Sequence, residues 1–266
     1  MFRRRSILAL PLALAAANAA PRPFRHVLVY GEEGRFGGWP ANHGIWNWGD
    51  EIVCGFSASY FIKTDPERHQ RDRTRPDEPY LARSMDGGET WVIERPASLI
   101  PPEQGGAKPV TLAEPMDFTA PGFAFTLRGQ NAHDTPSRFW YSTDRARTWQ
   151  GPFEFPMFGR KGIDGRTDYQ VYGKHEALVF ATAAKENGRE GRPFCARTVD
   201  GGLTWKLQGW IGPEPQGFSI MPSTVMLPNG RLLCAVRVKR DERIRWTCGP
   251  ATTRARPGRS SRGRSR

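Results

Sequence analysis

Short apolar runs separated by turn-forming residues dominate the chain after its first twenty residues. The runs are four to eight residues long and rich in β-branched and aromatic side chains, and Gly, Pro, Asn or Asp follows most of them. This pattern is typical of β-strands, whereas long apolar stretches at helical spacing are absent. We therefore predict an all-β fold with strands at 51–56, 80–83, 138–141, 177–181, 194–197, 218–225 and 232–237.

One octet, Ser/Thr-x-Asp-x-Gly-x-Thr-Trp, occurs three times, at 84–91, 142–149 and 198–205. Asp86 and Asp144 are 58 positions apart, Asp144 and Asp200 are 56 apart, and Ala146 replaces Gly in the second copy. Self-similarity at such a period indicates a propeller or a solenoid. Each octet follows a predicted strand pair, so the unit reads as a four-stranded antiparallel meander.

The residue types of the octet suit a tight hairpin. Asp-Gly-Gly provides the positive φ angles of the turn, and the Asp carboxylate can accept hydrogen bonds from neighbouring hydroxyl and amide groups. The Trp begins the outgoing strand, where its ring can pack on the next sheet.

These octets resemble the Asp-box repeat of the sialidase (neuraminidase) superfamily, over residues 26–245. The resemblance implies a six-bladed β-propeller, here incomplete at about three and a half blades, with the ligand site at the central axis. It also implies that the Asp boxes lie at the periphery and are structural, so they are not candidate catalytic residues.

The pattern changes near the C-terminus. A fourth blade begins at 218–225, but residues 246–266 are rich in Arg, Gly and Ser and are expected to be disordered. Codons for 246–258, read two nucleotides later, can encode a further Asp box. The hypothesis is that a frameshift near residue 243 shortened a longer gene; an in-frame stop with no downstream Asp boxes at the locus would refute it.

The formal net charge of +12 is concentrated at the two ends. Three arginines lie at 3–5 and six within 254–266, and without them the formal charge is +3. The body of the protein is nearly balanced, which argues against nucleic acid as a partner.

The first 19 residues have the composition of an export signal. Arg3 to Arg5 precede an apolar core at 7–17 and the small-x-small site Ala17-Asn18-Ala19. A twin-arginine signal and an ordinary secretory signal both fit. We expect a secreted or periplasmic protein with no stable membrane anchor after cleavage.

The four cysteines, Cys54, Cys195, Cys234 and Cys248, match no zinc or redox spacing. Buried free thiols are the expectation, and a Cys195–Cys234 disulfide is an alternative. The sequence predicts no cofactor and no metal constellation, although a structural calcium ion stays open.

In sialidases the nucleophile is a Tyr, and the resemblance implies an Asp as acid/base and three arginines that hold the substrate carboxylate. The family's acid/base Asp precedes the strand that enters the first Asp box. Asp77 occupies that place and Glu78 is the near alternative, whereas a solvated loop acid is the structural alternative. The family's Tyr and its Glu come from late blades, outside the part of the fold that this chain resembles.

The arginines depart from the family pattern. His43 occupies the place of the first arginine, and the next strand offers only Lys63 as a cation. Arg128 and Arg237 lie at the ends of candidate inner strands and could point at the axis. Asn42 and Trp46, with the neighbouring tryptophans, suit sugar binding or blade packing equally.

Two functions follow from these observations. The first is a sialidase-like exo-glycosidase that hydrolyses terminal sugars of glycans, impaired in this chain. The second is a non-catalytic Asp-box propeller that binds carbohydrate or protein, which the missing arginine motif favours. Either takes a glycan as ligand, and the oligomeric state is not predictable.

Overall fold

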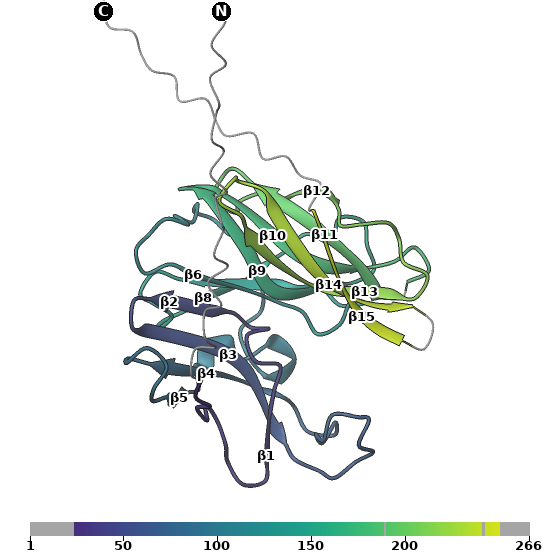
Figure 1. Ribbon diagram of the computed structural model, residues 1–266. Coiled ribbons are helices and arrows are strands. Elements are labelled where there is room, and N and C mark those ends of the chain that lie inside the picture. The colour runs from purple at the N-terminus through teal and green to yellow at the C-terminus, as the bar shows by residue number, and fades with distance from the viewer. Residues whose placement is uncertain (1–23, 189, 241–242, 251–266) are drawn as a thin grey trace, which may run out of the picture.

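A computed structural model describes residues 24–250 apart from 189, 241 and 242, and Figure 1 shows it as an all-β molecule. Every strand pair within its sheets is antiparallel. The described helical elements are two single 3-10 turns, η1 (Ala97–Leu99) and η2 (Pro102–Gln104). The all-β prediction is confirmed.

The first sheet is built around one long strand, β3, and its inner edge is interrupted. Two short strands, β1 and β2, pair with opposite halves of the same edge of β3, and residues 39–44 loop out between them. The other edge pairs with β4, which pairs with β5. The bounds are β1 Arg35–Gly38, β2 Ile45–Trp48, β3 Glu51–Tyr60, β4 Glu78–Ser84 and β5 Val92–Glu94.

The central seven-stranded sheet contains two blades. One has three strands and the other has four, and a single residue pair between β6 and β9, Arg128 with Arg166, joins them. The four-stranded meander is thus confirmed for the later blade, whereas the earlier one has no inner strand. The bounds are β6 Ala124–Arg128, β7 Arg138–Ser142, β8 Gln150–Glu154, β9 Ile163–Gly173, β10 Glu176–Ala184, β11 Glu190–Thr198 and β12 Lys206–Trp210.

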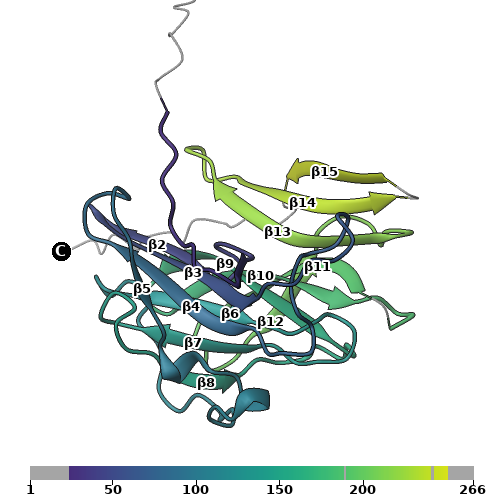
Figure 2. The same ribbon diagram turned by 90° about the horizontal axis from the view of Figure 1, so that it is seen from below.

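The last sheet consists of β13 (Phe218–Met226), β14 (Leu232–Arg240) and β15 (Arg243–Pro250), and Figure 2 shows it beside the rest. The strands predicted at 218–225 and 232–237 are present and pair with each other, and Gly230 in the turn between them has φ of 75°. Residues 246–250 belong to β15, so the boundary of the expected tail at 245 is too early. The rest of that tail and the expected export signal lie outside the described residues.

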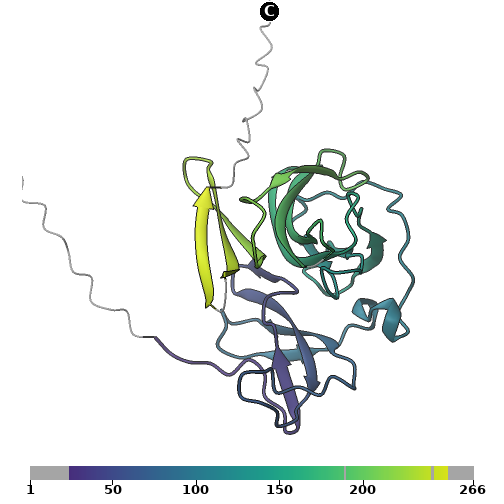
Figure 3. The ribbon, with the colours of Figure 1, turned by 90° about the vertical axis from the view of Figure 1, so that its right-hand side faces the viewer.

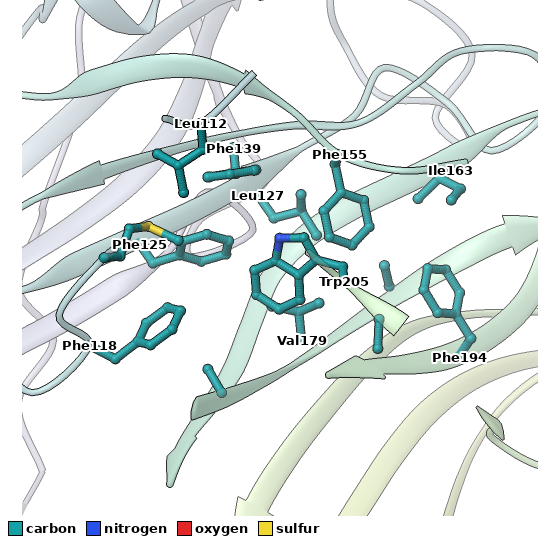
Figure 4. Close-up of a cluster of buried hydrophobic side chains, with 14 of the residues drawn as sticks. Leu112, Phe118, Phe125, Leu127, Phe139, Phe155, Ile163, Val179, Phe194 and Trp205 are labelled. Atoms are coloured by element: carbon teal, nitrogen blue, oxygen red, sulfur yellow. The ribbon is translucent and has the colours of Figure 1, made fainter. Parts of the chain in front are cut away.

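Hydrophobic side chains fill the seams between successive blades. Figure 3 shows how the central strands curl, and the largest cluster comes from these strands and the loops beside them. Phe125, Phe139, Phe194 and Trp205 belong to this cluster, as Figure 4 shows. A second cluster joins the first blade to the next one, and a third lies between β10, β11 and β14. Because each sheet packs face to face on its chain neighbour, the fold is an incomplete propeller.

The three Asp boxes occupy equivalent turns, between the last two strands of their blades. In each, the Asp accepts hydrogen bonds from the Ser or Thr two residues earlier (2.7–2.8 Å) and from the Thr hydroxyl four residues later (2.5–2.6 Å). The carboxylates therefore lock the turns, as the structural interpretation predicts.

No helix within the described residues is long and apolar enough to cross a membrane.

Candidate functional site

The loop at 39–44 separates two cavities on the inner edge of the blades. It lies directly on β3, because Ala41 N donates to Gly55 O (2.9 Å) and Gly55 N donates to Gly44 O (2.8 Å). A Cβ at Gly55 would lie 2.8 Å from Cβ of His43, so this close approach requires glycine. Trp39 and Ala41 have φ of 52° and 61°, a strained conformation for side chains of their kind.

The first cavity has a volume of about 410 Å³ and a strongly basic wall. It lies between the first blade and the next two, and β3, β4, β6, β7 and β9 or the loops beside them contribute to it. Its wall includes Trp39, His43, Ser57, Arg71, Arg75, Asp77, Arg128, Arg138, Trp140 and Arg166.

Asp77 lies at the wall of this cavity and forms an ion pair with Arg71. Arg71 Nη1 donates to both carboxylate oxygens, at 2.7 and 2.8 Å, and the Ser59 hydroxyl donates to Oδ1 at 2.5 Å. The Arg71 guanidinium also lies over the Trp39 ring, 5.1 Å from its centroid. Asp77 is thus held in place as a carboxylate beside a cation.

Arg128 has a different environment. Its Nε donates to the Thr126 hydroxyl (3.0 Å), but Nη1 and Nη2 are buried and have no hydrogen-bond partner. Burial lowers the pKa of Arg128 to about 9, so the side chain stays a cation at neutral pH. By contrast, Arg71, Arg138 and Arg166 are paired with Asp77, Glu103 and Asp164.

His43 lies next to this cation. Its Nε2 is 3.3 Å from the Ser57 hydroxyl and its Nδ1 is buried without a partner. Burial, with the charges of Arg128 and Arg166, lowers the pKa of His43 well below its ordinary value. The imidazole is therefore neutral and contributes hydrogen bonding rather than charge.

The second cavity, of about 440 Å³, lies on the other side of the loop. Asn42 and Trp46 line it, together with Arg166, Asp168 and Thr224. The Trp46 ring also packs on Trp149, 5.4 Å between centroids, so the alternative role in blade packing holds for this residue as well.

The structure brings together only some of the eight residues singled out in the sequence. Asp77, His43 and Arg128 share the first cavity, whereas Asn42 and Trp46 belong to the second. Glu78 is outside both and pairs with Arg35 at 2.9 Å. Lys63 is exposed in the loop after β3, and Arg237 lies in β14 near the Phe218 ring; neither contributes to the two cavities.

Sequence reasoning missed several arginines of these walls, among them Arg71, Arg138 and Arg166. Arg138 begins β7, and Arg166 lies within β9. In the sequence, each is a charged residue in a run that is otherwise typical of a strand. Such a signal does not say which arginine faces the axis, because that depends on how the blades are placed.

The thiols of Cys54 and Cys195 are free, so the alternative Cys195–Cys234 disulfide is not formed. Burial, with nearby Cys234 and Asp168, raises the pKa of the Cys195 thiol to about 12. Within the described part of the chain, no group of three His, Cys, Asp or Glu side chains is arranged to hold a metal ion.

No protein-family model and no curated protein matches this sequence. Among solved structures, a protein of unknown function from Dyadobacter fermentans is similar, with a TM-score of 0.56 and 16% identity. The match covers 79% of this chain and 64% of that one, so the chain spans less than two thirds of that protein's length.

Two enzymes are similar at lower TM-scores. The endo-arabinase from Bacteroides thetaiotaomicron has a TM-score of 0.48 at 10% identity, over 80% of this chain and 75% of its own. The Trypanosoma rangeli sialidase, solved in complex with sialic acid, has a TM-score of 0.47 at 15% identity, over 78% and 36%. The chain is thus distantly similar in structure to glycoside hydrolases, and at these identities the likeness concerns the fold alone.

Proposed function

We propose that the protein binds the terminal acidic sugar of a glycan in the cavity around Arg128, as a member of a sialidase-like lineage of exo-glycosidases. One observation carries the proposal: the Arg128 guanidinium is buried at the cavity wall and both its terminal nitrogens are unpaired.

A buried cation without a counter-charge is energetically unfavourable, and a bound anion removes that penalty. The guanidinium matches a carboxylate because its two terminal nitrogens can donate in parallel. Trp39 and Trp140, in the same wall, provide apolar faces for a sugar ring. An acidic sugar combines these two features, the carboxylate and the ring.

Hydrolysis would require a proton donor at the glycosidic oxygen, and Asp77 is the candidate in this cavity. Asp77 would have to be released from Arg71 and take up a proton before it could donate one. His43 is neutral and can hydrogen-bond a sugar hydroxyl.

Binding without turnover is the second candidate function. The ion pair between Asp77 and Arg71 favours it, because this contact occupies both carboxylate oxygens, which an acid at the glycosidic oxygen would need free. Export to the periplasm or the medium is part of either proposal, since both act on glycans outside the cytoplasm.

The test is a titration of the full chain with N-acetylneuraminic acid, monitored by calorimetry. We expect Arg128→Gln to weaken binding at least tenfold, because the charge-assisted hydrogen bonds are lost. Arg231→Gln, at an exposed turn outside both cavities, is the matched control and should bind as the unmodified protein does. Equal binding by both variants would refute the proposal.

Turnover of a fluorogenic sialoside separates the two candidates. Hydrolysis that Asp77→Asn abolishes supports the exo-glycosidase. Binding with no hydrolysis by the unmodified chain supports the non-catalytic protein.

A further inference from the structure

The second cavity contains a buried carboxyl group with one oxygen that neither the fold nor the Arg128 site uses. Asp168 lies in β9, and its Oδ1 accepts a hydrogen bond from the Thr224 hydroxyl of β13 (2.8 Å). Its Oδ2 is buried and has no partner. One oxygen of Asp168 therefore links two blades, and the other oxygen has no hydrogen-bond donor.

The surroundings fix the position of this carboxyl group. Gln170 Nε2 donates to the Thr224 hydroxyl at 3.1 Å, which orients that hydroxyl toward Asp168. Met221, on the same stretch of β13, has φ of 55°, a strained conformation that places the backbone of 221–224 against the cavity. The site is built from β2, β9, β13 and the 39–44 loop, and its polar groups are held in place before a ligand binds.

The wall composition limits the class of ligand. A buried acceptor without a donor favours a ligand with hydroxyl or ammonium groups. Arg166, which pairs with Asp164 at 2.8 Å, places a guanidinium in the same wall as Asp168, so the wall does not favour an ammonium ion over a neutral donor. Hydroxyl donors remain, and Trp46, Pro40 and Pro222 provide apolar surface for the carbon face of a ring.

We infer that the cavity around Asp168 is a second saccharide site, which binds the hydroxyl groups of a neutral sugar with Asp168 as the acceptor. The class of ligand rests on the proposed function, since a glycan that presents an acidic terminal sugar also contains neutral ones. The site itself rests on the buried Oδ2 and the cavity that it faces.

Binding at this site should depend on pH. Burial raises the pKa of Asp168 to about 7, so the stronger, ionised acceptor is present at pH 8 and largely absent at pH 5.5. Other groups near Asp168 keep one state over this range. Burial raises the pKa of Tyr169 and of the Cys195 thiol to about 12, the pKa of His43 is far below its ordinary value, and Arg166 stays charged.

The experiment is a titration of the full chain with D-glucose and with D-glucosamine, which carries an ammonium group on the same ring at pH 5.5. Amide shifts in 168–170 and 223–224 report occupancy by NMR. We expect glucose to bind in the millimolar range at pH 8, at least fivefold more weakly at pH 5.5, and glucosamine at pH 5.5 no better than glucose.

Asp168→Asn keeps the shape of the side chain and an acceptor for Thr224. We expect this variant to lose the fivefold advantage at pH 8 and to match the unmodified protein at pH 5.5. The pH comparison on the unmodified protein stands even if the variant does not fold. Shifts that are absent at both pH values, or affinity that is independent of pH, would overturn the inference.

Arg128→Gln separates this inference from the proposed function. Glucose binding should be unchanged in that variant, while binding of N-acetylneuraminic acid falls. If Arg128→Gln weakens the binding of N-acetylneuraminic acid but glucose does not bind to the unmodified protein, only the second site is refuted. If glucose binds but Arg128→Gln leaves the binding of N-acetylneuraminic acid unchanged, only the proposed function is refuted.

Discussion

At the scale of single residues, two isolated ionisable side chains define the candidate chemistry. Arg128 is a buried cation without a carboxylate, and Asp168 is a buried carboxyl group with a free oxygen. Most other charged groups near the cavities are paired, as Asp77 is with Arg71. An unpaired ionisable group inside a protein lowers stability, so its persistence points to a ligand.

Asp168 also predicts how stability depends on pH. Its folded-state pKa of about 7 is above the ordinary value of 3.8, so the native state binds the proton more tightly than the unfolded chain. The Asp168 contribution to the free energy of unfolding is present at low pH and declines as the pH rises from about 4 to about 7. The decline is at most about 1.4 kcal/mol per pH unit.

Urea denaturation at pH 5 and pH 8 tests this. We expect Asp168→Asn to reduce the loss of stability between the two values relative to the unmodified protein, because Asn does not titrate. Identical pH dependence in the two proteins would show that Asp168 is solvated in the native state.

At the scale of elements, one buried carboxylate ties the second Asp box to the first blade. Glu51 in β3 is 3% exposed and pairs with Arg83 (2.7 Å), Arg145 (2.9 Å) and Arg147 (2.8 Å). Arg145 and Arg147 occupy variable positions of the second octet, on either side of the Ala146 that replaces Gly. Arg145 makes the contact between blades from a strained backbone position, because it has φ of 61° where the other two octets have glycine.

We expect Glu51→Gln to lower the free energy of unfolding by about 2 kcal/mol, because it removes the buried carboxylate shared by three arginines, while Arg83 keeps its ion pair with Glu94. Burial alone would raise the pKa of Glu51, but the ion pairs with Arg145, Arg83 and Arg147 lower it. The stability that Glu51 contributes is thus present above its unfolded-state pKa and lost as the pH falls through the folded-state pKa.

Chemical denaturation at pH 7 measures the effect, with Glu89→Gln as the control on an exposed position of the first octet. A change within about 0.5 kcal/mol for Glu51→Gln would mean that the network contributes little, as exposed ion pairs do.

At the scale of the whole molecule, stability comes from the seams between blades. The largest cluster joins β6–β8 to β9–β12 through aromatic rings, among them Phe194, which is fully buried against Phe158 and Trp210. The cavities lie where the inner edges of these blades meet the first and last sheets. The same packing that buries the rings thus determines which polar side chains share a cavity.

Phe194→Ala should lower the free energy of unfolding by about 3 to 5 kcal/mol, because it leaves a cavity in the largest cluster. Val199→Ala, at a site with 59% exposure in the adjacent turn, is the control and should change it by less than about 0.5 kcal/mol. Thermal unfolding followed by circular dichroism compares the two. A small effect of Phe194→Ala would indicate that the seam is loosely packed.

The sequence by itself determined the strand content and the three Asp-box turns, because both depend on local contacts. Alternation of apolar residues and Asp-Gly chemistry act over a few positions, so 84–91, 142–149 and 198–205 could be placed in hairpins without any tertiary information. It also identified Asp77, His43 and Arg128, which share a cavity.

Only the tertiary structure decided how these residues are paired and which neighbours they have. The pairing of Asp77 with Arg71, the burial of Arg128 and the free oxygen of Asp168 depend on how blades far apart in sequence are placed. Burial and pairing are properties of the space around a group, and the order of residues along the chain does not specify that space.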